Sequence, residues 1–146
     1  MKDKIKIGFS AGFIGALILI LVQFIFKWLG WAGNPGFIGI YHKTFGVHIL
    51  AVDIIISAFL FAVSGGIWGA IFTLLLKPNI LKGIIFGFAP SLWVWLVISP
   101  YMGFPIFHGF ALKPILFPII FNCLIWGSFV GWYAAKSARK YRFLYS

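Results

Sequence analysis

The sequence consists of long apolar stretches separated by short polar segments. An α-helix needs about 20 predominantly apolar residues to cross a ~30 Å hydrocarbon core. Four stretches reach that length, at residues 7–29, 48–76, 80–99 and 114–135. We therefore predict an all-α fold, a four-transmembrane-helix bundle, that forms a single integral membrane domain over residues 1–146.

Two of the four stretches depart from a regular span. The second is longer than a bilayer crossing requires, so we expect it to tilt or to begin in the interface. The third carries Pro90 near its middle. Proline lacks an N–H and clashes with the preceding turn, so a kink is expected there. In a membrane a neighbouring helix must then satisfy the freed carbonyl.

Composition supports a lipid environment. Hydrophobic residues make up 62% of the chain and charged residues 10%, which is too little polar surface for a soluble domain of this length. The net charge of +10 comes from cations at the ends of the apolar stretches, where anionic headgroups attract them. Membrane lipids are therefore expected partners. Nucleic acid is not, because its recognition needs a basic face on a soluble module.

The cations are unevenly shared between the two sides of the predicted bundle. Three fall on one side, at Lys27, Lys43 and Lys113, and nine on the other: Lys2, Lys4, Lys6, Lys77, Lys82, Lys136, Arg139, Lys140 and Arg142. The positive-inside rule then predicts a multi-pass protein of the cell (inner) membrane with both termini cytoplasmic. The outward loops, at 30–46 and 100–113, are rich in Gly, Pro and aromatic residues and are expected in the headgroup layer.

Each predicted span carries a pair of glycines four residues apart. The pairs are Gly8 and Gly12, Gly65 and Gly69, Gly83 and Gly87, and Gly127 and Gly131. Small residues let membrane helices approach closely, so these pairs predict packing faces and inner ends that nearly touch. The alternative is that glycine is simply frequent, at 17 of 146 residues.

Two pairs of short, similar sequence segments suggest an internal repeat. Gly8–Phe13 resembles Gly83–Phe88, and Ile67–Ala70 resembles Ile125–Ser128. Each pair would run the same way across the membrane, which predicts two parallel-repeat hairpins about an axis along the membrane normal. Chance similarity is the alternative, because the segments are short.

A similarity to known membrane proteins extends over four short segments: Lys82–Gly87, Pro100–Gly103, Phe107–Gly109 and Trp126–Gly131. Through them the region from about residue 48 to 135 resembles an uncharacterised group of small four-helix bacterial inner-membrane proteins. That group also places histidines at the outer ends of helices, as His48 and His108 would be here. The resemblance implies a helical bundle in a bacterial-type membrane, and it implies no activity.

Ionisable side chains near the outward ends are the candidate site residues: His42, His48, Asp53 and His108. Imidazoles with a carboxylate suit Zn or Cu. However, His48 and Asp53 lie five residues apart, about 140° around a helix, so one metal could not easily take both. We expect Asp53 to pair with Lys43 or Lys113. The alternative for the histidines is hydrogen bonding to loop carbonyls.

The remaining polar residues within the spans are few. Gln23, Ser57, Ser64, Asn122 and Ser128 are expected to make interhelical hydrogen bonds. They form no continuous polar stripe of the kind that lines a conduction path. The sequence has no nucleophile–base pair, paired carboxylate or phosphate loop, and a single cysteine, Cys123. We predict neither enzyme activity nor a cofactor.

Three functional hypotheses follow. The first is an accessory or structural membrane protein that packs through its glycine faces, as a homo-oligomer or against other membrane subunits. The second is a small transporter or channel for an apolar or weakly polar solute, motivated by the repeat and the kinked third span. The third is an outward-facing metal or ligand binding protein built on the histidines and Asp53.

Overall fold

The computed structural model describes residues 1–141 and 144–145 of the chain. Four helical runs in it are long and apolar enough to cross a membrane: Lys2–Trp28, Leu50–Leu75, Ile80–Tyr101 and Leu112–Ala138. The predicted all-helical bundle is confirmed, and these runs fit a multi-pass membrane protein. The second run begins at Leu50 rather than at residue 48, a small difference that matters for the site.

The first two spans are continuous and the last two are segmented. Helices α1 (Lys2–Trp28) and α3 (Leu50–Leu75) form the first hairpin. The third span comprises α4 (Ile80–Phe86), α5 (Phe88–Trp93), the π-helical η1 (Val94–Ile98) and α6 (Ser99–Tyr101). The fourth comprises α7 (Leu112–Pro118), the π-helical η3 (Ile119–Gly127) and α8 (Ser128–Ala138). Wide π-helical turns are rare and are frequently found at functional sites.

The loop between the first two spans contains a helix that the sequence patterns did not predict. Helix α2 (Gly36–Phe45) begins directly after Pro35 and is too short to span a bilayer. Its Phe37 is buried and stacks on Phe61 of α3, with ring centroids 5.0 Å apart. This contact fixes α2 against the first hairpin.

The interruption of the third span lies one turn before the expected proline. Helix α4 ends at Phe86, and α5 begins at Phe88. Pro90 cannot donate to the carbonyl four residues earlier, which belongs to Phe86, and its ring crowds that turn. The irregularity therefore falls at Phe86–Gly87, while Pro90 itself is buried.

In the fourth span, a second proline leaves a backbone carbonyl without its hydrogen-bond donor, and a side chain of a neighbouring helix replaces that donor. Pro118 has no N–H for the Pro114 carbonyl. The indole Nε1–H of Trp95, on the third span, donates to that carbonyl at 3.0 Å. The Ser91 hydroxyl likewise contacts the Pro118 carbonyl at 3.2 Å. Side chains of the third span therefore supply hydrogen-bond donors where the fourth span departs from α-helical geometry.

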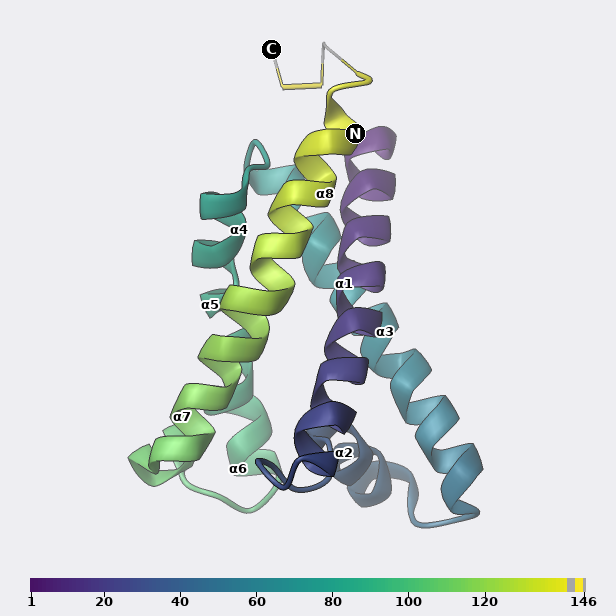
Figure 1. Cartoon of the computed structure of the whole chain (residues 1–146), viewed down its shortest axis with the longest axis vertical. Coiled ribbons are helices and arrows are strands. Elements are labelled where there is room, and N and C mark those ends of the chain that lie inside the picture. Colours follow the sequence, from purple (N-terminus) through teal and green to yellow (C-terminus); the bar gives the residue numbers. More distant parts are fainter. Residues whose placement is uncertain (142–143, 146) are drawn as a thin grey trace.

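The helices converge at one end and diverge at the other. Figure 1 shows both termini at the same end, where α1, α4 and α8 come together. Toward the opposite end, which carries α2, α6 and the start of α7, the spans spread apart. We call these the terminal end and the loop end.

Glycine pairs close the first hairpin at the terminal end. A Cβ on Gly12 would overlap the Gly65 carbonyl oxygen, and one on Gly8 would overlap the Gly69 carbonyl oxygen. A Cβ on Gly69 would in turn come within 2.9 Å of the Gly12 Cα. The backbones of α1 and α3 therefore meet directly, as the spacing predicts.

The second hairpin repeats this arrangement. A Cβ on Gly83 would overlap the Gly127 carbonyl and lie 2.9 Å from the Gly131 Cα. Gly87 faces the backbone of Asn122 and Cys123, and Gly131 faces that of Asn79. Each hairpin thus uses its own glycines internally. The shared contact pattern supports the parallel-repeat interpretation, although duplication stays a prediction.

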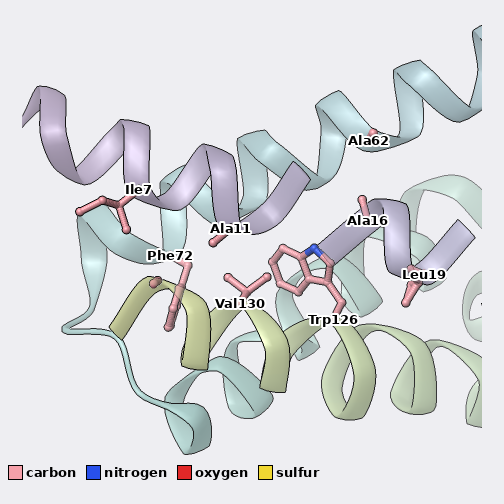
Figure 2. Packing of buried hydrophobic residues seen from close by; sticks show 9 residues of the cluster. Ile7, Ala11, Ala16, Leu19, Ala62, Phe72, Trp126 and Val130 are labelled. Carbon is pink, nitrogen blue, oxygen red and sulfur yellow. The ribbon is translucent and has the colours of Figure 1, made fainter. Parts of the chain in front are cut away.

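A buried cluster joins the two hairpins. Ile7, Ala11, Ala16 and Leu19 of α1 pack with Phe72 of α3 and with residues of the fourth span (Figure 2). Among the latter, Trp126 is 5% exposed and donates its indole Nε1–H to the Gly12 carbonyl at 3.1 Å. This hydrogen bond ties the fourth span to the glycine contact of the first hairpin.

We predict that Gly12→Ala destabilises the protein by about 1–3 kcal/mol, because its methyl group would push the α1 and α3 backbones apart. Gly36→Ala is the control: a Cβ there meets nothing within 4 Å. Reversible unfolding in mixed micelles measures both. A Gly12→Ala variant as stable as the wild type would contradict the backbone contact.

Candidate functional site

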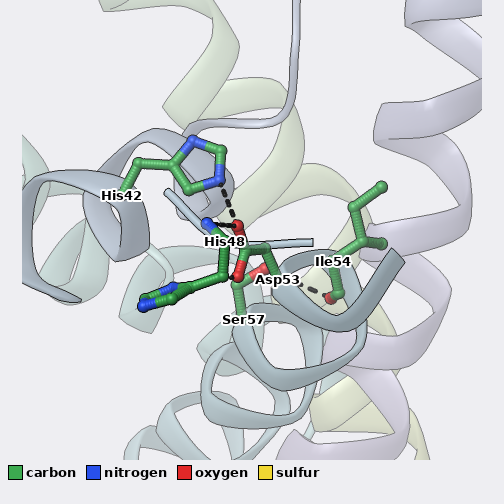
Figure 3. Close-up of polar contacts among 5 residues, drawn as sticks. All are labelled: His42, His48, Asp53, Ile54 and Ser57. Atoms are coloured by element: carbon green, nitrogen blue, oxygen red, sulfur yellow. Dashed lines mark hydrogen bonds and ion pairs between the residues drawn. The ribbon is translucent and has the colours of Figure 1, made fainter. Parts of the chain in front are cut away.

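Asp53 joins α2, the α2–α3 loop and α3 at the loop end. It lies in the first turn of α3, and its side chain is fully buried. Its Oδ2 accepts the His48 backbone N–H at 2.9 Å and lies 3.0 Å from His42 Nε2 on α2. The His48 ring Nδ1 lies 3.5 Å from Oδ1 (Figure 3). The first turn of a helix favours such a carboxylate.

The prediction that Asp53 pairs with Lys43 or Lys113 was wrong. Within residues 1–141 and 144–145, its ion-pair contacts are the two histidines, and neither Lys43 nor Lys113 reaches it. The 140° separation of His48 and Asp53 assumed that both lie in one helix. Because α3 begins only at Leu50, His48 precedes the helix, and its backbone can turn back onto the carboxylate. For the His42 ring, which bonds to Asp53, the alternative of a loop-carbonyl partner is therefore wrong as well.

The fourth candidate, His108, lies elsewhere. It belongs to a left-handed turn in which Phe107, His108 and Phe110 have φ of 54°, 54° and 60°. Left-handed conformations are costly for residues other than glycine and cluster at functional sites. The His108 ring stacks on Phe104 with centroids 3.9 Å apart.

The arrangement does not present the four candidates to one metal. In the described part of the chain, no group of three or more His, Cys, Asp or Glu side chains is placed to hold a metal ion. His42 and His48 approach different oxygens of Asp53. This geometry suits a hydrogen-bonded clamp that holds α2 against α3.

A cavity of about 390 Å³ lies between the two hairpins at the loop end. Residues from α1, the following loop, α2 and α3 line one side, and residues from the third and fourth spans line the other. Its volume falls in the range of about 300–1,000 Å³ that is usual for small-molecule sites. Both π-helical segments contribute to its wall, through Val94 and Ile98 of η1 and Phe121 and Asn122 of η3.

The cavity wall is mostly apolar and includes several aromatic rings, and a few polar groups interrupt it. The rings are those of Phe37, Phe61, Phe104, Phe117 and Phe121. The polar side chains are Gln23, Asn34, Ser99, His108 and Asn122. None of the described residues that line the cavity is Lys, Arg, Asp or Glu.

Hydrogen bonding fixes one of these polar groups in place. The Asn122 Nδ2 donates to Ser91 Oγ at 3.2 Å, and Ser91 Oγ is 2.9 Å from the Gly87 carbonyl. A primary amide has two donors and an acceptor, so this bond leaves one N–H and the carbonyl oxygen of Asn122 for a ligand. Gln23 contributes a second amide to the cavity, from the first hairpin.

The predicted interhelical role of the polar residues is confirmed for Asn122, which bonds across to the third span. It is wrong for Ser57 and Ser128, whose hydroxyls donate to carbonyls of their own spans. Four side chains that the sequence patterns did not single out make bonds between spans: Thr73, Ser91, Trp95 and Trp126. For Ser91 and Trp95, the neighbouring prolines were the available signal.

Comparison of the chain with protein-family models, curated proteins and solved structures finds no match. The resemblance to small four-helix bacterial inner-membrane proteins stays a prediction. The functional argument therefore depends on the geometry of the cavity and of the clamp beside it.

We predict that Asp53→Ala loosens α2. The change leaves the His48 N–H without its acceptor, at a cost of about 1–3 kcal/mol in local stability. Hydrogen exchange should quicken over residues 36–49 but not over the terminal end. Asp53→Asn keeps an acceptor oxygen, so its exchange rates over residues 36–49 should lie between those of Asp53→Ala and the wild type. Wild-type exchange rates in Asp53→Ala would disprove the clamp.

Proposed function

We propose that the protein is a membrane binding protein, or carrier, for a neutral, weakly polar small molecule that dissolves in lipid. The observation that carries this proposal is the cavity between the two hairpins, with its aromatic wall and its amides. Such a combination of apolar surface with a few polar groups is typical of ligand sites.

The neutral character of the ligand follows from the cavity lining. A charged molecule would lose its hydration on entry, at a cost of several kcal/mol, unless an opposite charge met it. The described lining residues offer no carboxylate, ammonium or guanidinium group, and the His108 imidazole among them is stacked on the Phe104 ring. Phenylalanine rings instead favour flat or apolar groups through stacking and edge contacts.

The weakly polar character follows from the amides. Gln23 and Asn122 belong to different hairpins, and both face the cavity. A ligand with one or two carbonyl or hydroxyl oxygens could accept a hydrogen bond from each. A pure hydrocarbon would leave these groups without partners, which is unfavourable in an apolar surrounding.

The proposed orientation places the cavity toward the outside of an inner membrane. Eight of the twelve Lys and Arg residues belong to described segments at the terminal end, and a ninth that the sequence assigns to that side, Arg142, lies outside the described residues. The positive-inside rule supports cytoplasmic termini. The loop end, with the cavity, would then face the outer leaflet, from which a lipid-soluble ligand could enter.

The glycine faces that were proposed to support an accessory or oligomeric role are already occupied within the chain. The eight glycines proposed as packing faces each lie against the chain's own helices. A second copy or another subunit would therefore have to dock elsewhere. That hypothesis stays a prediction. The four residues proposed for an outward metal site are not placed to hold one metal ion together.

We predict that filling the cavity abolishes binding of a neutral, lipid-soluble probe. N-phenyl-1-naphthylamine should show one saturable site per chain in nanodiscs, above the background of empty nanodiscs. Ile40→Trp places an indole at the cavity wall, and the saturable signal should disappear. Ile55→Trp, on a side chain that is 69% exposed on α3, should leave it intact.

Two results would contradict the proposal. A wild-type protein without a saturable component, or an Ile40→Trp variant that binds as the wild type does, would rule out the cavity as the binding site.

We further predict discrimination by the amides. Duroquinone and durene share a tetramethyl six-membered ring, but only the quinone has carbonyl oxygens. Gln23→Met and Asn122→Leu should each weaken duroquinone binding about fivefold, because a neutral hydrogen bond contributes about 1 kcal/mol. Durene binding should not change, and it serves as the folding control. Equilibrium binding of radiolabelled compounds to nanodiscs measures both, with Ser128→Ala as the matched variant.

Equal weakening of both compounds would mean that the amides shape the cavity and do not bind the ligand's oxygens. Binding of durene without any preference for duroquinone would preserve the cavity as a site but reject a weakly polar ligand.

A further inference from the structure

A second hollow lies at the terminal end, far from the cavity along the bundle. It has a volume of about 580 Å³ and is formed by the start of α4 and the last turns of α8. From α4 and the preceding loop come Asn79, Ile80 and Leu81, and from α8 and the residue that caps its C-terminus come Trp132, Ala135, Lys136 and Arg139. We call it the basic hollow.

Among the residues that the structure describes, no carboxylate pairs with the two cations of the basic hollow. The sequence contains only two acidic residues, Asp3 and Asp53. Asp53 is at the loop end with the histidines, and no lysine or arginine ion pair occurs in residues 1–141 and 144–145. The positive charge of Lys136 and Arg139 is therefore available to an external anion. Two cations three residues apart on a helix lie on the same face.

The hollow also has an apolar part, which argues for an amphiphile rather than a free ion. Leu81 and Trp132 are 65% and 46% exposed beside the cations. The Lys136 Nζ lies 5.2 Å from the centre of the Trp132 ring. Tryptophan prefers the membrane–water interface, so this contact sets Lys136 at the depth of lipid headgroups.

We propose that the basic hollow binds the anionic headgroup of a membrane phospholipid. The phosphate lies between Lys136 and Arg139, where the guanidinium can donate two hydrogen bonds to it. The acyl chains run along Leu81 and Trp132 toward the bilayer core. Because this lipid fills the groove between α4 and α8, it braces the second hairpin at the terminal end. The site is independent of the cavity at the loop end.

Native mass spectrometry of the detergent-solubilised protein tests the site with two lipids of equal chain length, phosphatidylglycerol and phosphatidylcholine. The wild type should retain phosphatidylglycerol preferentially. The double variant Lys136→Gln with Arg139→Gln should weaken that binding about tenfold or more, because each of the two cations attracts the anionic headgroup and so adds to the affinity. Lys2→Gln with Lys6→Gln removes the same charge from the same end and should weaken it no more than about twofold.

Three results would overturn the assignment. Equal retention of the two lipids by the wild type would mean that the headgroup charge is not recognised. Equal losses in the two double variants would mean diffuse attraction by the whole terminal end. Displacement of phosphatidylglycerol by millimolar inorganic phosphate or glycerol 3-phosphate would assign the hollow to a free phosphate instead. Failure of all ligand binding at the cavity would leave this proposal unaffected.

Discussion

Direct contact between helix backbones at the glycines is the constraint on which the rest of this structure depends. Lipid offers little hydrophobic drive for helices to associate, so close approach must supply the attraction. Gly12 against Gly65 and Gly83 against Gly127 bring the backbones of each hairpin together near the terminal end. With Trp126 joining the hairpins there, the spans are free to diverge toward the loop end, where the cavity lies.

The irregular spans complete the cavity and give it polar groups. Pro118 leaves the carbonyl of Pro114 without its helical donor, and Trp95 of the third span supplies one. The same region winds as a π-helix, which brings Asn122 to the cavity wall with its amide held by Ser91. Local disruption of α-helical geometry is thus coupled to hydrogen bonding between spans, and both are coupled to the chemistry that the cavity offers a ligand.

The sequence was sufficient for the four spans and their glycine contacts, because hydropathy and glycine spacing are local signals, but it did not predict α2. The four spans and the glycine pairs could be read from residues a few positions apart. The site could not, because its parts come from distant segments. Asp53 meets His42 only because α2 folds back onto α3, and the start of α3 at Leu50 decides how His48 turns. The cavity itself depends on how far the hairpins diverge, which no periodicity encodes.

The divergence of the hairpins can be measured directly by electron spin–spin coupling in nanodiscs, with Cys123 replaced by serine. One labelled pair, Val47 and Leu112, reports on the loop end, and a second, Ile5 and Leu81, on the terminal end; all four side chains are exposed. We predict a clearly longer separation for the loop-end pair than for the terminal-end pair. A loop-end separation equal to or shorter than the terminal-end one would mean parallel, closed hairpins, and the cavity would not exist.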